Sequence, residues 1–138
     1  MSERILPVPD ESSAPYWEAA ARHVLKLPKC SRCGEFSLPP DLTCPNCHSL
    51  DPEFVYEAVS GQGTVKTWTV IRRSFLQGFE LPFMLVDVQL DDQPGVRMIG
   101  KLVDGADTPI RRGDAVKVTF EDLAPGVAVP AFTLAARP

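Results

Sequence analysis

Hydrophobic and polar residues alternate through much of the second half of the chain. In residues 82–90 apolar side chains occupy every second position, and residues 115–123 repeat this spacing. A period of two places these side chains on one face of an extended chain, as in strands that bury a single face. Three further β-rich segments complete the set of predicted strands: residues 63–73, 96–104 and 131–138.

The segments between these predicted strands contain turn-forming residues. A tight hairpin is predicted at residues 91–95 (DDQPG), another at residues 111–114 (RRGD), and a looser link at residues 124–130. Five strands within about 75 residues, with no sustained helical period, favour a small closed barrel of the OB-fold type. The prediction is therefore a mainly β protein whose five-stranded OB-fold barrel spans residues 59–138.

The N-terminal region has a helical rather than an extended pattern. Residues 1–11 are rich in proline and acidic residues and are predicted to form an extended arm. Ser12 or Ser13 can cap a helix that has Pro15 in its first turn and ends before Pro28. The apolar face of this helix has residues three or four positions apart: Trp17, Ala20, Ala21, Val24 and Leu25.

The aromatic face of the predicted helix has two interpretations. It can pack against the domain to which the helix belongs, which is the usual role of such a stripe, or it can dock onto a partner. Tyr16 and Trp17 are therefore candidate partner contacts. His23 is expected within the same helix, half exposed. The arm and the helix together form the first predicted region, residues 1–26.

Composition limits the class of protein. The chain has 138 residues, 44% of them hydrophobic, and a net charge of −4. An acidic chain is a poor general binder of nucleic acid, which requires a cationic face. No run of 18 apolar residues and no secretory leader is visible, so a cytoplasmic location without membrane insertion is expected, where thiols stay reduced.

All four cysteines lie within residues 29–49, as two C-x-x-C pairs: Cys30, Cys33, Cys44 and Cys47. Each pair can supply two ligands from a single tight turn, and the two pairs together can bind one ion. Gly34 and Pro45 suit such turns. Four thiolates favour tetrahedral Zn²⁺, and a closed set leaves no position for substrate. The spacing predicts a structural, rubredoxin-like zinc ribbon over residues 27–58, with an iron electron-transfer site as the main alternative.

No set of catalytic residues is visible. His48, next to Cys47, is predicted to be a turn residue rather than a substitute ligand. With every cysteine committed to metal, neither histidine has a thiol to activate, and no nucleophile-elbow or nucleotide-binding motif is present.

Residues 70–83 (VIRRSFLQGFELPF) form the best candidate for a contact surface. Arg72 and Arg73 are followed by an apolar loop that contains Phe75 and Phe79. Such a loop either folds back on the barrel or meets a protein partner, while paired arginines can receive phosphates. On the predicted third strand, Arg97 and Lys101 can add positive charge to the same face, and Trp68 either stacks on a base or belongs to the core.

Taken in order, these motifs resemble a known family. "YWEAA", C-x-x-C-G followed by C-P-x-C, "GQGTVKTWTVI", "PFMLVDVQLDD", "VRMIGKLVD" and "RRGDAVKVTFED" are similar to the zinc-ribbon/OB-fold acyl-CoA-associated proteins, formerly a domain of unknown function. The resemblance covers about residues 15–136.

The resemblance implies a function. Members are small accessory subunits of thiolase-like enzymes, including retro-aldolases that shorten steroid side chains, and some are joined to an enoyl-CoA hydratase domain. It implies a cytoplasmic, non-catalytic subunit of a heteromeric complex in lipid metabolism, which binds a thiolase-fold partner and helps to hold an acyl-CoA thioester. The four cysteines would be zinc ligands. A single-stranded nucleic-acid binder of zinc-ribbon/OB type is the alternative.

Overall fold

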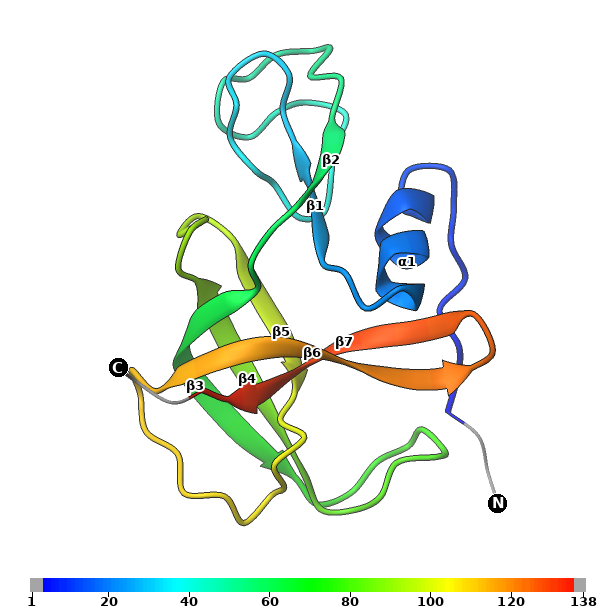
Figure 1. The fold of residues 1–138 in the computed structure, drawn as a ribbon, viewed down its shortest axis with the longest axis vertical. Helices are drawn as coiled ribbons and strands as arrows, with labels where there is room; N and C mark the ends of the chain where they lie inside the picture. Colours follow the sequence, from blue (N-terminus) through cyan, green and yellow to red (C-terminus); the bar gives the residue numbers. More distant parts are fainter. Residues whose placement is uncertain (1–3, 136–138) are drawn as a thin grey trace.

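The computed structural model describes residues 4–135. In this part of the chain there are one helix and seven strands, in this order: α1 (Ala14–Ala21), β1 (Lys26–Lys29), β2 (Val55–Ala58), β3 (Gln62–Ile71), β4 (Phe83–Leu90), β5 (Arg97–Lys101), β6 (Ala115–Ala124) and β7 (Val127–Leu134). The strands β3 to β7 form one sheet, while β1 and β2 form a separate ribbon at one end of the molecule (Figure 1). None of the described helices is long and apolar enough to cross a membrane.

The five-stranded sheet has the order β5-β4-β3-β6-β7, and all its neighbouring strands are antiparallel. A parallel bridge between Leu102 and Phe132 brings the end of β5 to β7 and joins the two edges of the sheet. This closure is typical of an OB-fold, in which a barrel leaves few unpaired strand edges. The predicted fold class, mainly β with an N-terminal helix, a zinc ribbon and a five-stranded barrel, is confirmed.

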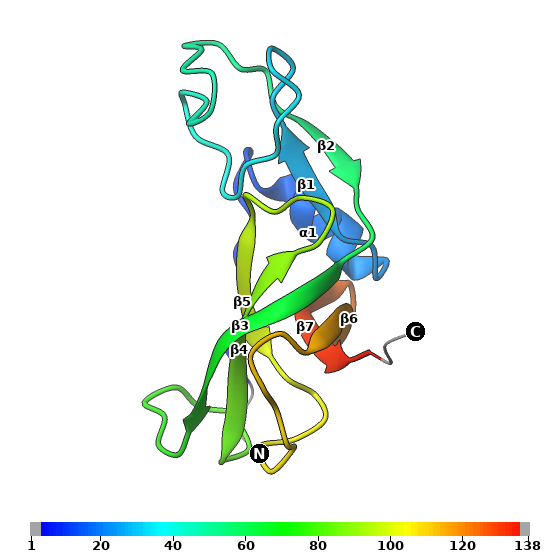
Figure 2. The same ribbon diagram turned by 90° about the vertical axis from the view of Figure 1, so that its left-hand side faces the viewer.

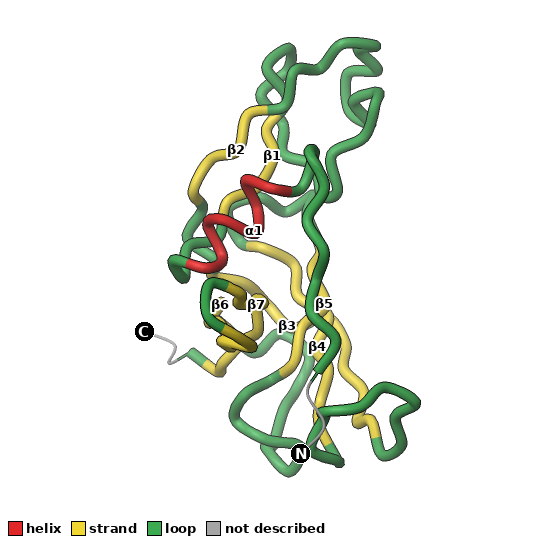
Figure 3. Tube along the Cα trace, turned by 90° about the vertical axis from the view of Figure 1, so that its right-hand side faces the viewer, coloured by secondary structure: helices red, strands yellow, loops and turns green. Residues whose placement is uncertain are grey.

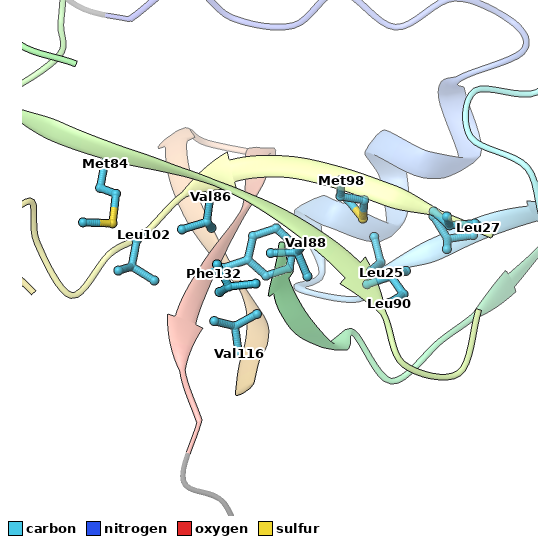
Figure 4. Packing of buried hydrophobic residues seen from close by; sticks show 12 residues of the cluster. Leu25, Leu27, Met84, Val86, Val88, Leu90, Met98, Leu102, Val116 and Phe132 are labelled. Atoms are coloured by element: carbon cyan, nitrogen blue, oxygen red, sulfur yellow. The ribbon is translucent and has the colours of Figure 1, made fainter. Parts of the chain in front are cut away.

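The core of the barrel is made by the alternating apolar positions that the sequence shows. On β4, Val86, Val88 and Leu90 are all completely buried and point to the interior. Figure 4 shows Val86, Val88 and Val116 near the ring of Phe132, while Leu90 lies beside Leu25. Phe132 also lies against Gly100, where an added Cβ would be 2.9 Å from the ring. The barrel therefore closes tightly because β5 has no side chain at this point.

Two turns differ from the predictions. Residues 124–130 are not a loose link. β6 extends to Ala124 and β7 begins at Val127, so the two strands form a tight hairpin in which Gly126 has a positive φ. Residues 111–114 form a turn but not a hairpin, because β6 pairs with β3 and not with β5. Of the predicted last strand, residues 136–138 lie outside the described residues.

The helix is shorter than predicted. Ser13 is the N-cap and a proline follows in the first turn, as expected, but α1 ends at Ala21. His23 has a φ of +60°, which turns the chain out of the helix before Leu25. Leu25 and Leu27 nevertheless reach the core from the segment that leads into β1. His23 is accordingly not a helical residue, and its Nε2 lies 2.8 Å from Asp122 Oδ1 on β6.

The short β1–β2 ribbon was not predicted as strands. Leu27 pairs with Glu57 and Pro28 with Tyr56, so the segments before and after the cysteines return side by side. The N–H of Val59 donates to the carbonyl of Leu25 (3.0 Å) and continues this contact towards the barrel. Figure 2 shows the cysteine-bearing loops beyond the ribbon, on the side away from the barrel.

Candidate metal centre and contact loop

The four cysteine sulfurs form a compact cluster. All of the Sγ atoms lie within 4.8 Å of one another. The Cys30–Cys47 and Cys33–Cys44 Sγ pairs are 3.8 and 3.7 Å apart. A tetrahedral zinc ion with Zn–S bonds of about 2.3 Å requires sulfur–sulfur distances of about 3.8 Å. The four thiols are therefore arranged to bind a structural Zn²⁺ ion.

Both cysteine pairs sit on the same type of turn. The N–H of Gly34 donates to the carbonyl of Cys30, and the N–H of His48 donates to that of Cys44, each at 2.9 Å. Gly34 and His48 both have positive φ, +79° and +64°. His48 is thus the counterpart of Gly34, an exposed residue that closes the second turn, as predicted.

Hydrogen bonds to sulfur prepare the site for a cation. The side-chain amide of Asn46 donates to Cys33 Sγ (3.4 Å) and, with the N–H of Glu35, lowers the pKa of that thiol to about 6. The backbone N–H of Cys47 is the main cause that lowers the pKa of Cys44. The N–H of Ser49 acts in the same direction on Cys47. It is outweighed by desolvation and the neighbouring sulfurs, which raise the Cys47 pKa to about 11.

These pKa directions have a chemical consequence. Thiolates are the metal-binding form of cysteine, and several of them close together repel one another unless a cation lies between them. A bound cation would offset the effect of the neighbouring sulfurs, which is one of the causes that raise the pKa of Cys47. Cys30 and Cys44 are buried and Cys47 is exposed, so the ion would be covered by protein on one side and would hold the loops together.

The contact loop, residues 72–82, joins β3 to β4 and is divided into an exposed tip and a packed base. At the tip the ring of Phe75 is fully exposed and Leu76 is 54% exposed. Arg72 and Arg73 are exposed, and neither forms an ion pair within residues 4–135. The contact loop therefore has two cations where it leaves β3, without an ion pair among the described residues, and an exposed apolar ring two residues further on.

The base of the contact loop folds back on the barrel, which is one of the two interpretations that the sequence left open. The ring of Phe79 stacks on Phe83, with centroids 4.9 Å apart. The guanidinium of Arg4 lies over the ring of Phe79, 4.4 Å from its centroid. Phe79 is thus half-buried, whereas Phe75 projects freely, although the sequence places both in one apolar loop.

The aromatic pair on α1 lies at a different place. Tyr16 and Trp17 meet edge to face at 4.9 Å, and Tyr16 packs against the barrel core. Burial raises the pKa of Tyr16 to about 12. Trp17 lines a small hollow with Pro7 of the arm and Val127 of the β6–β7 hairpin. These contacts are within the chain, and no partner is needed to explain them.

The positive charge expected on the third barrel strand is neutralised. Arg97 makes two hydrogen bonds to Asp87, at 2.9 and 2.5 Å. Lys101 Nζ lies 3.3 Å from Glu121 of β6. Arg97 and Lys101 therefore do not add a free cationic surface to the contact loop, and the expectation that they would do so is wrong. Residues distant in sequence, Asp87 and Glu121, supply the compensating charges.

Trp68 lies on the barrel wall and is 40% exposed. With Thr69, Leu85 and Ile99 it borders a shallow hollow of about 320 Å³ on strands β3, β4 and β5. The hollow is mainly apolar, and its charged residue, Asp87, is paired with Arg97. A binder of single-stranded nucleic acid combines exposed aromatic rings with a positive groove, and only the first of these is present here.

Comparison with protein families gives two adjoining matches. Residues 17–53 match the model described as "ChsH2, rubredoxin-like zinc ribbon domain". Residues 56–121 match the model described as "ChsH2, C-terminal OB-fold domain". The boundary between the two matches falls at the ribbon strand β2, where the chain passes from the metal centre to the barrel.

Solved structures have the same arrangement. A structure described as "Ltp2-ChsH2(DUF35) aldolase" is 27% identical, with a TM-score of 0.81, and the match covers 94% of this chain and 99% of that chain. A DUF35 protein of unknown function from Sulfolobus solfataricus shares the fold, with 12% identity and a TM-score of 0.59, over 91% of this chain and 86% of that chain.

Among curated proteins, this chain is similar to "Probable enoyl-CoA hydratase alpha subunit" of Thermomonospora curvata, with 29% identity over 126 residues. The match covers 91% of this chain but only 38% of that protein. The chain described here thus corresponds to about two fifths of the length of its relative.

Proposed function

The chain belongs to the ChsH2 family of rubredoxin-like zinc-ribbon/OB-fold proteins, and from this premise we propose that it is a non-catalytic accessory subunit of an enzyme acting on acyl-CoA thioesters. Its partner would be a thiolase-fold enzyme that forms or cleaves a carbon–carbon bond. The similarity to a structure described as an Ltp2-ChsH2 aldolase favours a retro-aldolase partner, with a steroid side chain as the finer proposal for the substrate.

One observation carries this proposal: the contact loop combines a fully exposed phenyl ring with two exposed arginines that form no ion pair within residues 4–135. Phe75 is the kind of aromatic anchor that fills a pocket at a protein interface. Arg72 and Arg73 can each donate two hydrogen bonds to a phosphate, and coenzyme A carries phosphates. The loop would thus contact both the partner and the CoA portion of the thioester near their interface.

The metal centre has a structural part in this proposal. Cys30, Cys33, Cys44 and Cys47 would be the zinc ligands, and their closed set leaves no position at which a substrate could bind. Zinc would contribute folding energy to the ribbon, and the chemical steps would take place on residues of the partner. A thiolate site of this kind is maintained in a reducing compartment, so we place the subunit in the cytoplasm.

The relative from Thermomonospora curvata supports a second partner class. Because that protein is named as an enoyl-CoA hydratase subunit, hydration of an acyl-CoA is the alternative reaction of the complex. This chain corresponds to 38% of that protein, so a hydratase activity would be supplied by another segment or subunit. Both alternatives share an acyl-CoA thioester as the substrate class.

The experiment that tests the proposal is purification of the tagged chain from its own host, followed by mass spectrometry of proteins that co-elute in stoichiometric amount. A thiolase-fold protein is the expected result, and a hydratase would select the second partner class. Retention of single-stranded nucleic acid instead, weakened by added salt, would overturn the proposal in favour of the alternative binder.

A pair of variants sharpens this experiment. Phe75→Asp should abolish co-elution, because it puts a charge at the proposed anchor. Leu50→Asp, at a position on the ribbon that is 86% exposed, introduces the same charge elsewhere and should leave co-elution unchanged. Equal co-elution of both variants would exclude the loop tip as the interface.

A further inference from the structure

The N-terminal arm, residues 4–10, follows the surface of the barrel before α1 begins. Figure 3 shows this segment running from the helix along the strands towards the N-terminus. Near its helical end, Pro7 and Pro9 border the hollow that contains Trp17 and Val127. The arm is therefore held at one end by α1 and the β6–β7 hairpin, and prolines restrict its backbone.

The other end of the arm is held by a single arginine. The guanidinium of Arg4 lies 4.4 Å from the ring centroid of Phe79 in the contact loop. Its Nη1 also forms an ion pair with Glu121 Oε1 on β6 at 3.2 Å. The Arg4 side chain is only 19% exposed, which is low for an arginine. Arg4 therefore connects three segments that are distant in sequence.

This contact extends into the barrel as a layered stack. Arg4 covers Phe79, and Phe79 in turn stacks on Phe83 at the start of β4. Glu121, which is 21% exposed, also receives Lys101 at 3.3 Å, so one carboxylate is shared by two cations. A cation over an aromatic ring that also has a carboxylate partner suits arginine better than lysine, because the guanidinium is planar and has several donors.

We propose that Arg4 is a positioning residue: it clamps the base of the contact loop to the barrel, and so holds Phe75 at the tip, and Arg72 and Arg73 at the start of the loop, in position for binding. The effect of the clamp on partner binding rests on the proposed function. Its effect on the loop does not, because loop mobility can be measured in the chain alone. Preorganising a loop lowers the ordering cost that binding would otherwise incur.

Limited trypsin digestion of the folded chain tests the clamp directly. Cleavage after Arg73 reports local opening of the contact loop, and cleavage after Arg112, in an exposed turn elsewhere, is an internal reference. Arg4→Gln should accelerate cleavage after Arg73 roughly tenfold, the size of effect expected when a cation–π contact and a part-buried ion pair are lost. Cleavage after Arg112 should be unchanged.

Three further variants separate positioning from a general loss of stability. Arg4→Lys keeps the charge but not the planar guanidinium, and should give an intermediate rate of cleavage after Arg73. Arg22→Gln, at an exposed position after α1, should behave as the unmodified chain does. Phe79→Leu should accelerate cleavage after Arg73, and adding Arg4→Gln to it should cause only a small further change, because both remove the same contact.

The results separate the clamp from the proposed function. Equal cleavage rates for Arg4→Gln and Arg22→Gln, or fully additive effects of the Arg4 and Phe79 variants, would overturn the clamp. A clamp confirmed by digestion, in a chain that recovers no thiolase-fold or hydratase partner, would leave the inference intact and reject the proposed function. Where a partner is recovered, Arg4→Gln should weaken the affinity of the chain for that partner, even though Phe75 itself is not mutated.

Discussion

The cysteine-bearing loops and the contact loop are both irregular segments, but different forces hold them in place. The cysteine loops have few large side chains to bury, and Leu42 and Leu50 are almost fully exposed. Their arrangement depends on four sulfurs around one ion. The contact loop has no cluster of metal-ligating side chains among the described residues, and its base is held by the contacts of Arg4, Phe79 and Phe83. A metal can fix a whole segment, whereas a local stack fixes a base and leaves a tip free to bind.

The largest expected effect is the loss of one zinc ligand. Cys44→Ser should release the metal and unfold the ribbon, because structural zinc sites of this kind contribute about 10 kcal/mol or more to folding. Zinc content after dialysis and thermal unfolding would measure the change, with Thr43→Ser as the control. Retained zinc with an unchanged melting curve would contradict the role of Cys44. Purified protein should also be colourless, because ferric iron in the same site would be red.

The second prediction concerns the barrel, which is stabilised neither by the metal centre nor by the contacts of Arg4 but by its apolar core. Phe132→Ala removes the ring at the centre of the core and should lower the free energy of unfolding by about 3–5 kcal/mol. Denaturant unfolding at neutral pH would give the value, with Phe75→Ala as the control for loss of an exposed ring. A loss below 1 kcal/mol would mean that the core does not depend on this side chain.

The third prediction concerns α1, which packs against β7 of the barrel and β1 of the ribbon. Tyr16 has a pKa raised from 10.0 to about 12 by burial. Because the folded state resists its ionisation, stability is fully present below pH 10 and is lost as the pH rises towards 12. The difference amounts to about 2–3 kcal/mol at most. Tyr16→Phe should lack this part of the alkaline loss.

Urea unfolding at pH 8 and pH 11.5 would measure this difference between the two chains. Tyr56→Phe is the comparison variant, because Tyr56 is less buried, although its pKa is raised by the same cause. An identical alkaline loss in the Tyr16→Phe variant and the unmodified chain would show that Tyr16 is not buried as described.

The smallest expected effect on the fold is at the tip of the contact loop. Phe75→Asp should change the free energy of unfolding by no more than about 0.5 kcal/mol, because the ring is fully exposed and supports no other residue. Thermal unfolding of the isolated chain would check this. A large loss of stability would show that the ring packs against the chain and is not free to anchor a partner.

The regular parts of this fold could be predicted because each depends on a local pattern. The alternation in β4 and the C-x-x-C spacing are complete within a few residues, so the barrel and the metal centre were both predictable. The end of α1 was not, because it depends on the left-handed backbone of His23, which the apolar spacing does not reveal.

The state of individual charges was less predictable than the fold. Arg97 and Arg73 look alike in sequence, but Arg97 meets Asp87 across two paired strands and Arg73 meets no acid within the described chain. The Arg4 clamp likewise needs Glu121, 117 positions away. Such pairings arise only when the barrel closes, so sequence reasoning could name the contact loop but not which of its residues would remain free.

The position of Leu27 links the metal to the rest of the molecule. It is completely buried in the core, yet only two residues separate it from Cys30. A chain folded without zinc would therefore lack an anchored β1 and would have an incomplete core. Under the proposed function, the supply of zinc would therefore limit how much of the subunit can assemble with its partner.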